Sequence, residues 1–78
     1  MEHLSDFQTG DRGIVCDVHG EDALLARLLD MGFTPGTRVS VALCAPTGDP
    51  IVVRLRGYLL SLRRSEAACI SVHRQKKA

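Results

Sequence analysis

Cys16, Asp17, His19 and Glu21 form the densest group of metal-ligating residue types in this 78-residue chain. Thiolate, imidazole and carboxylate groups all bind divalent transition metals, so Cys16, His19 and Glu21 are a candidate site for Fe²⁺ or Zn²⁺. A structural interpretation explains the same residues as a small core thiol, a turn histidine and an acidic helix cap. We favour this structural interpretation and expect no required cofactor, so that any bound metal ion is adventitious or regulatory.

No catalytic constellation accompanies this group. No serine stands in a recognisable sequence pattern with a histidine and a carboxylate. Gly48-Asp49-Pro50 lacks the lysine and hydroxyl residue that complete a phosphate-binding loop. Cys16, Cys44 and Cys69 are far apart and include no C-x-x-C pair, which argues against a closed zinc site or a disulfide framework. The sequence therefore predicts a protein that is not an enzyme and does not bind GTP itself.

Length, charge and hydropathy narrow the class of protein further. A chain of 78 residues forms one domain (1–78) with a small core. The formal net charge is +1 and aromatic residues make up 4%, so we expect no binding to nucleic acid. The first residues lack a signal pattern, and no apolar run approaches the ~20 residues of a membrane span. We expect a cytoplasmic protein with no direct membrane insertion and a frayed basic tail over residues 74–78.

One short amphipathic helix is predicted over residues 23–31. Apolar side chains recur there at helical spacing, at Leu24, Leu28 and Met31. Gly32 follows at the position where many helices end in a left-handed residue, and Phe33 can then fold back on the last turn. Pro35 lacks a backbone N–H, so the helix cannot resume. A helix this short is held in place by packing rather than by its own propensity.

Alternating apolar residues predict five strands, over residues 13–18, 39–43, 51–55, 58–62 and 69–72. A bulge near Cys16-Asp17 would turn both Val15 and Val18 inward. In the second strand, the alternation places Val39, Val41 and Leu43 on one buried face. Five short strands with a helix after the first indicate a mainly β fold, a small antiparallel β-barrel.

Strand alternation also directs some apolar side chains away from the core. Leu59, Val52 and Ile14 are expected on the outer face, and Arg27 and Asp30 on the solvent-facing rim of the helix. Scattered exposed apolar residues are normal in soluble proteins. If these residues cluster, they form a contact patch for a partner or a homodimer face. These five residues are the candidate partner-binding residues.

Three blocks of this sequence, residues 27–36, 45–50 and 57–67, resemble the FeoA family in order and spacing. The resemblance extends from about Gly10 to Val72 and implies an SH3-like β-barrel, in agreement with the strands and helix expected above. The motif residues within the blocks are expected to be structural, because a compact barrel needs turns at these places. They are Met31, Gly32, Pro35, Gly36, Gly48, Asp49, Pro50 and Gly57.

The resemblance also implies a function. FeoA-like proteins are small cytoplasmic partners of FeoB, a membrane permease with a cytoplasmic GTP-binding part, and they regulate Fe²⁺ uptake. The expectation is an accessory protein of bacterial ferrous iron uptake, recruited to the inner membrane face by the permease. The alternative is a transition-metal-responsive SH3-like interaction module, related to the C-terminal domains of metal-dependent repressors. We expect no DNA-binding region before this domain, so the free-standing form is the better match.

Overall fold

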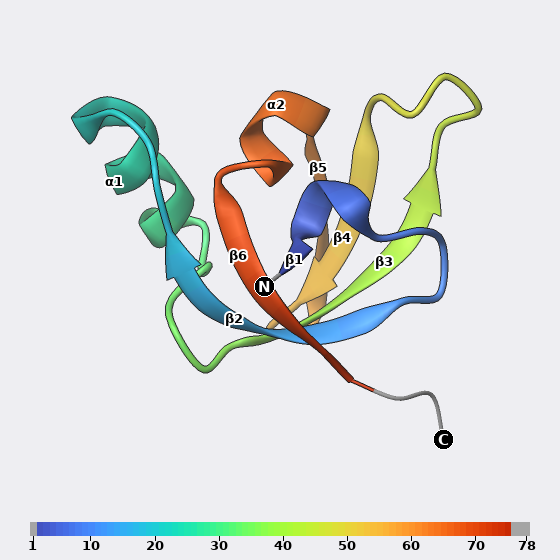
Figure 1. Ribbon diagram of the computed structural model, residues 1–78, viewed down its shortest axis with the longest axis horizontal. Helices are drawn as coiled ribbons and strands as arrows, with labels where there is room; N and C mark the ends of the chain where they lie inside the picture. The colour runs from blue at the N-terminus through green and yellow to red at the C-terminus, as the bar shows by residue number, and fades with distance from the viewer. Residues whose placement is uncertain (1, 76–78) are drawn as a thin grey trace.

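The computed structural model describes residues 2–75, which form one curved antiparallel sheet that wraps around the core (Figure 1). The strands follow the order β1-β6-β2-β3-β4-β5 across the sheet. The strand bounds are β1 (Glu2–His3), β2 (Arg12–Val18), β3 (Arg38–Cys44), β4 (Ile51–Leu55), β5 (Tyr58–Leu62) and β6 (Ile70–Gln75). The helices are α1 (Asp22–Asp30), the short α2 (Arg64–Ala67) and a single 3-10 turn, η1 (Leu4–Asp6). The mainly β architecture with a helix after the first long strand is confirmed.

The two ends of the described chain differ from expectation. The sheet has six strands rather than five, because β1 pairs with β6 and places Glu2 opposite Val72. Arg74 lies within β6 and is not part of a frayed tail. Its guanidinium binds Glu2 at 2.8 Å and Asp11 at 2.7 Å, and it lies 4.5 Å from the centre of the Phe7 ring. Residues 76–78 of the expected tail lie outside the described residues.

The first long strand, β2, contains the expected bulge. Its register against β6 shifts between Val15 and Asp17, so one residue of β2 has no partner there. Because of this shift, Val15 and Val18 are both buried although they are three positions apart. The bulge near Cys16-Asp17 is therefore confirmed.

A second bulge, in β3, was not expected. The register against β4 shifts between Val41 and Leu43, so that Leu43 pairs with Val52. Val39 and Val41 are buried as expected, but the Leu43 side chain is 57% exposed. The prediction that Leu43 shares their buried face is wrong. The extra residue in β3 shifts the alternation by one position, so the side chains after it point to the opposite face of the sheet.

The core fills the space between the curved sheet, η1 and the two helices. Leu28 of α1 is fully buried, while Leu24, Leu25 and Met31 pack partly buried against the core. The remaining buried apolar side chains come from η1, the strands, α2 and the connections between them, and are Leu4, Phe7, Val15, Val18, Phe33, Val39, Val41, Ile51, Val53, Leu55, Leu62, Ala67, Ile70 and Val72. Within residues 2–75, neither helix reaches the length and apolarity that a membrane crossing requires.

The end of α1 follows a known capping geometry. The N–H of Phe33 donates to the carbonyl of Leu28 at 3.1 Å, and the N–H of Gly32 donates to that of Leu29 at 3.0 Å. These two bonds define a Schellman motif, which needs a left-handed residue at Gly32. Gly32 has φ of +109°, and the Phe33 side chain is fully buried. The motif satisfies the last carbonyls of the helix and turns the chain toward β3.

Candidate functional site

The Cys16–Glu21 segment places its ligand-type side chains in separate environments. The Cys16 thiol is half-buried, and its Sγ lies 3.7 Å from the carbonyl oxygen of Ile14. His19 Nε2 is 3.0 Å from Ser71 Oγ and 4.0 Å from a carboxylate oxygen of Asp17. Glu21 occupies the N-cap position of α1 with extended backbone angles, but its side chain makes no capping hydrogen bond.

No metal-binding group of three side chains results from this arrangement. Across residues 2–75, the structure contains no cluster of three or more His, Cys, Asp or Glu residues that could hold a metal ion. Cys44 and Cys69 are also free thiols, and their Sγ atoms lie near the carbonyls of Phe7 and Ser65. A site made by Cys16, His19 and Glu21 stays a prediction, and it requires the segment to rearrange.

The candidate partner residues of the sheet divide into two places. Leu59 is 51% exposed on β5, and Val52 is half-buried on β4. Val52 pairs with Ser61 and with Leu43, so Leu59 lies diagonally across from Val52, within reach of its side chain. We call Leu43, Val52 and Leu59 the outer apolar strip. Sequence alternation missed Leu43 because the β3 bulge that exposes it has no local signature.

Ile14 is not part of this strip. It lies on β2, opposite Arg38 of β3 and His73 of β6, and its side chain is half-buried. Because β3 separates β2 from β4, Ile14 and Val52 are not neighbours across a strand pair. On the outer face, Ile14 is therefore separate from the outer apolar strip, which is the larger of these two apolar patches.

Arg27 and Asp30 are both exposed on α1, as expected, but Arg27 has a structural partner. Its guanidinium binds the carboxylate of Glu66, which is only 8% exposed and also accepts the N–H of Arg63 at 2.9 Å. Proximity along the chain would instead pair Glu66 with the side chain of Arg63 or Arg64. The observed pair joins α1 to α2, two elements whose interaction only the three-dimensional fold reveals.

The motif residues lie in three turns, where we expect them to be structural. Met31, Gly32, Pro35 and Gly36 belong to the connection from α1 to β3, and Gly57 to the turn between β4 and β5. The guanidinium of Arg56 joins these two turns by donating to the Gly32 carbonyl at 3.3 Å and to two threonine hydroxyls, those of Thr34 and Thr37. The Tyr58 hydroxyl donates to the Met31 carbonyl from the same side.

Gly48, Asp49 and Pro50 form the turn between β3 and β4. The carboxylate of Asp49 accepts the N–H of Arg64 at 2.9 Å, and the Arg64 guanidinium donates to the Gly48 carbonyl at 3.3 Å. The turn is thereby attached to the start of α2. This long-range contact of the Asp49 side chain cannot be inferred from the turn sequence alone.

Comparison with known proteins gives this arrangement a family. The FeoA domain model matches residues 2–74. A Fe(2+) transport protein A/Fe(2+) transporter FeoB fusion protein of Porphyromonas gingivalis is 42% identical over 69 residues, which cover 88% of this chain and 8% of that protein. The solution structure of a FeoA protein from Chlorobium tepidum superimposes with a TM-score of 0.87 at 43% identity, covering 96% of this chain and 71% of that chain.

Two further solved structures have a similar fold. A crystal structure of Stenotrophomonas maltophilia FeoA complexed with zinc, described as a prokaryotic SH3 domain protein, is 30% identical with a TM-score of 0.82, covering 94% of this chain and 91% of that chain. A manganese-dependent transcriptional repressor superimposes with a TM-score of 0.87 over 95% of this chain and 36% of that chain. That repressor is 21% identical, so the likeness concerns the fold alone.

Proposed function

The chain belongs to the FeoA family, and from this membership we propose that it is an accessory protein of ferrous iron uptake that binds the cytoplasmic part of a FeoB permease. The fold is the SH3-like β-barrel of that family, and FeoA is a transport-related domain rather than an enzyme family. The proposed partner recruits the protein to the inner face of the membrane. The proposed action is a protein contact that regulates the transporter.

The fusion relative is the observation that carries this proposal. It joins a domain 42% identical to this chain to a FeoB transporter in one polypeptide. This chain spans 8% of the length of that relative, so the transporter's activity belongs to the remainder. Linking two partners raises their effective concentration into the millimolar range, which maintains contacts too weak to persist between separate proteins. A modest affinity is therefore expected when the two proteins are separate chains.

Regulation requires that the protein distinguish between states of the transporter. A ligand that binds two conformations equally shifts nothing, however tightly it binds. The protein must therefore bind one state of the permease, such as one nucleotide state of its cytoplasmic domain, more tightly than another. A tenfold ratio between the two affinities corresponds to about 1.4 kcal/mol.

Two surfaces are available for this contact. The outer apolar strip of Leu43, Val52 and Leu59 lies on β3, β4 and β5, while Leu29, which is 37% exposed, lies on α1 with Arg27 and Asp30. Leu59 is more exposed than Leu29 and has Val52 as a diagonal apolar neighbour on β4. We therefore assign the contact to the strip, and we use Leu29 as the matched leucine on the other surface.

The proposal is tested by ferrous iron uptake under iron limitation in cells that lack the gene. Uptake should fall in the deletion strain and return with the wild-type protein or with Leu29→Ser, but not with Leu59→Ser. Unchanged uptake in the deletion strain would refute the transport role. If Leu29→Ser fails and Leu59→Ser restores uptake, the contact surface is α1 and the assignment to the strip is wrong.

A binding measurement complements the uptake assay. The purified cytoplasmic domain of the permease is titrated with the protein in the presence of GDP and of a non-hydrolysable GTP analogue. We expect binding in both states with different affinities, because only a difference can regulate. Equal affinities would contradict regulation through the nucleotide state while leaving a role in assembly.

The metal-responsive module is not advanced as a second function. The likeness to the repressor shows a shared fold at 21% identity, and residues 2–75 contain no three-residue metal cluster. A selective, tight site for Fe²⁺ or Mn²⁺ in the isolated protein would be the finding that revives it.

A further inference from the structure

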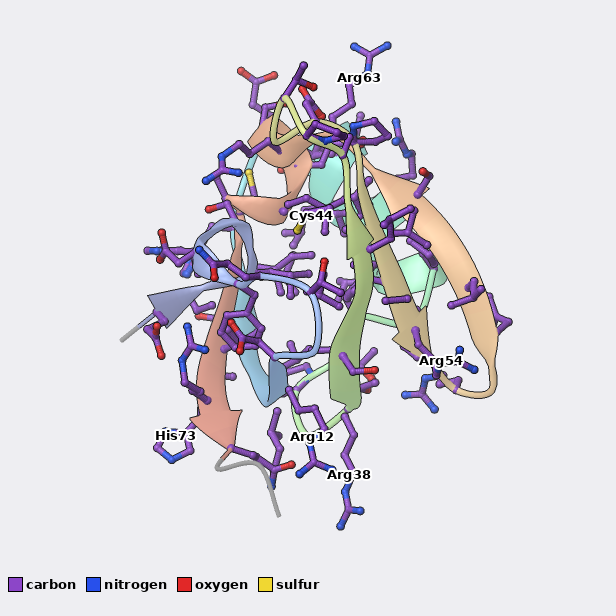
Figure 2. The ribbon with its side chains drawn as sticks, turned by 90° about the vertical axis from the view of Figure 1, so that its right-hand side faces the viewer. Arg12, Arg38, Cys44, Arg54, Arg63 and His73 are labelled. Carbon is purple, nitrogen blue, oxygen red and sulfur yellow. The ribbon has the colours of Figure 1, made fainter. Side chains whose placement is uncertain are left out.

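Three arginines from neighbouring strands share the outer face of the sheet. Arg12 of β2 and Arg54 of β4 both lie opposite Ser40 of β3, one on each side of it. Arg38 precedes Ser40 by two positions on β3 and so faces the same side. With adjacent strands about 4.8 Å apart, the Cα atoms of Arg12 and Arg54 are about 10 Å apart, and Arg38 is about 7 Å along β3 from Ser40. Figure 2 shows Arg12, Arg38 and Arg54 at one end of the molecule and Arg63 at the other.

These arginines line a shallow hollow of about 270 Å³, which we call the basic hollow. Arg56 and Gln75 also line it, and no carboxylate does within the described chain. The hydrogen bonds of Arg56 to the Gly32 carbonyl and to two threonines hold its guanidinium in place as a fixed positive charge. Four arginine residues therefore line the basic hollow.

The positive charge of the basic hollow is a local feature and does not result from a large net charge of the protein. The formal net charge of the protein is only +1. Elsewhere the structure pairs arginines with carboxylates: Arg27 binds Glu66, and Arg74 binds Glu2 and Asp11. Because no carboxylate of the described chain lines the basic hollow, this face attracts an anionic partner.

The basic hollow is continuous with the outer apolar strip. Arg54 pairs directly with Leu59 across β4 and β5, and Val52, two positions before Arg54, lies on the same face of β4. A partner that reaches the arginines is thus one residue pair away from exposed leucine side chains. The combined surface is basic at one end and apolar beside it.

We propose that the basic hollow and the outer apolar strip together bind a segment of the permease's cytoplasmic part that carries carboxylate side chains next to apolar ones. This inference rests on the proposed function and specifies the surface and the chemistry of the partner. The planar fork of a guanidinium matches a carboxylate through two parallel hydrogen bonds, which gives the contact orientation as well as attraction. The strip then buries the apolar side chains of the same segment.

The apolar strip argues for a protein rather than for nucleic acid or lipid. A phosphate backbone has no apolar groups to cover Leu59 and Val52, and among residues 2–75 no aromatic side chain lines the basic hollow to stack on bases. Amphipathic helices bind a membrane surface through leucines gathered on one helix face. Leu59 and Val52 instead lie on the outer face of strands β5 and β4.

Charge reversal of single residues tests the surface. The affinity of the permease's cytoplasmic domain is measured for wild-type protein, for Arg38→Glu and for Arg54→Glu, at 0.05 M and 0.15 M salt. Arg63→Glu makes the same change in net charge at the opposite end of the molecule and is the matched control. We expect each reversal in the hollow to weaken binding roughly tenfold and to reduce its dependence on salt, and the control to change affinity less than twofold.

The outcomes separate the surface from the function. If wild-type protein binds but Arg54→Glu and Arg63→Glu weaken binding equally, the basic hollow is not the contact, and the proposed function stands. If wild-type protein does not bind the permease domain, both the proposed function and the proposed partner of the basic hollow are refuted. Two further probes are phosphatidylglycerol vesicles and a mixed-sequence oligonucleotide. If the protein binds either probe more tightly than the permease domain, and Arg54→Glu abolishes that binding, the surface does not bind a protein segment.

Discussion

The clearest structural prediction concerns Gly32, for which Gly36 provides a matched control. Both residues have φ in the left-handed region, +109° and +91°. A Cβ at Gly36 would have no atom within 4 Å, whereas one at Gly32 would lie 3.1 Å from Cδ and Nε of Arg56 and 3.3 Å from Leu55. Gly36→Ala therefore measures backbone strain alone, which costs about 1–3 kcal/mol. Gly32→Ala adds the displacement of Arg56 to that strain.

The additional cost follows from what Arg56 does. Its guanidinium donates hydrogen bonds to Gly32, Thr34 and Thr37, each with a net value of about 1 kcal/mol, and its movement weakens one or two of them. Gly32→Ala should therefore lose about 1–2 kcal/mol more than Gly36→Ala. For a domain of this size the extra loss lowers Tm by roughly 4–16 °C. The total cost of about 2–5 kcal/mol lies below most of the ~4–12 kcal/mol range expected for 78 residues, so we expect Gly32→Ala to fold.

Urea denaturation followed by far-ultraviolet circular dichroism measures both variants. Equal destabilisation of Gly32→Ala and Gly36→Ala would refute the contact with Arg56 as the source of the extra cost. Gly32→Val, with a bulkier β-branched side chain, should be less stable still. If Gly32→Val folds with wild-type stability but loses binding to the permease domain, the turn is a binding element and its structural interpretation is wrong.

Three further predictions follow from features outside this turn. Val41→Ala should cost about 1–3 kcal/mol in urea denaturation and Leu43→Ala less than about 0.5 kcal/mol, and the reverse order would contradict the β3 bulge. The hydrogen bond from Arg74 lowers the pKa of Glu2 below 4.5, so its contribution to stability is present above pH 4.5 and is lost as the pH falls through the lowered pKa. Wild-type protein should lose more stability than Glu2→Gln between pH 6 and pH 3, and parallel losses would show that the pair contributes nothing. His19→Ala should leave the Zn²⁺ affinity measured by calorimetry unchanged, because His19 has only Ser71 and the Asp17 carboxylate beside it and belongs to no group of three ligand residues in the described chain; a tenfold loss would establish a metal site.

The sequence predicts features that local chemistry controls. The end of α1 is predictable because Gly32 and Phe33 occupy the positions that a Schellman motif requires. The β2 bulge is predictable because Val15 and Val18 can share the core in no other way. The exposure of Leu59 follows from simple alternation, which holds wherever a strand has no bulge.

What the sequence does not predict depends on pairing between distant residues. Leu43 is exposed because β3 has a bulge at a position with no special residue type. β1 is too short to have a periodicity, and only its pairing with β6 makes it a strand. The basic hollow likewise depends on the register that places Arg12 and Arg54 on either side of Ser40. These arginines are 42 positions apart in the chain, and no local pattern connects them.

The position of β6 in the sheet has a consequence for how the protein is made. β6 is the last of the described strands to leave the ribosome, yet it lies between β1 and β2 and pairs with both. A nascent chain that ends before Ile70 has no partner for β1, and its β2, paired with β3 alone, keeps an exposed edge open to pairing with other chains. The sheet therefore closes only when β6 has emerged, so folding is expected as one late, cooperative event. Ribosome-bound chains arrested before and after residues 70–75 would show this as a sharp gain in protease resistance.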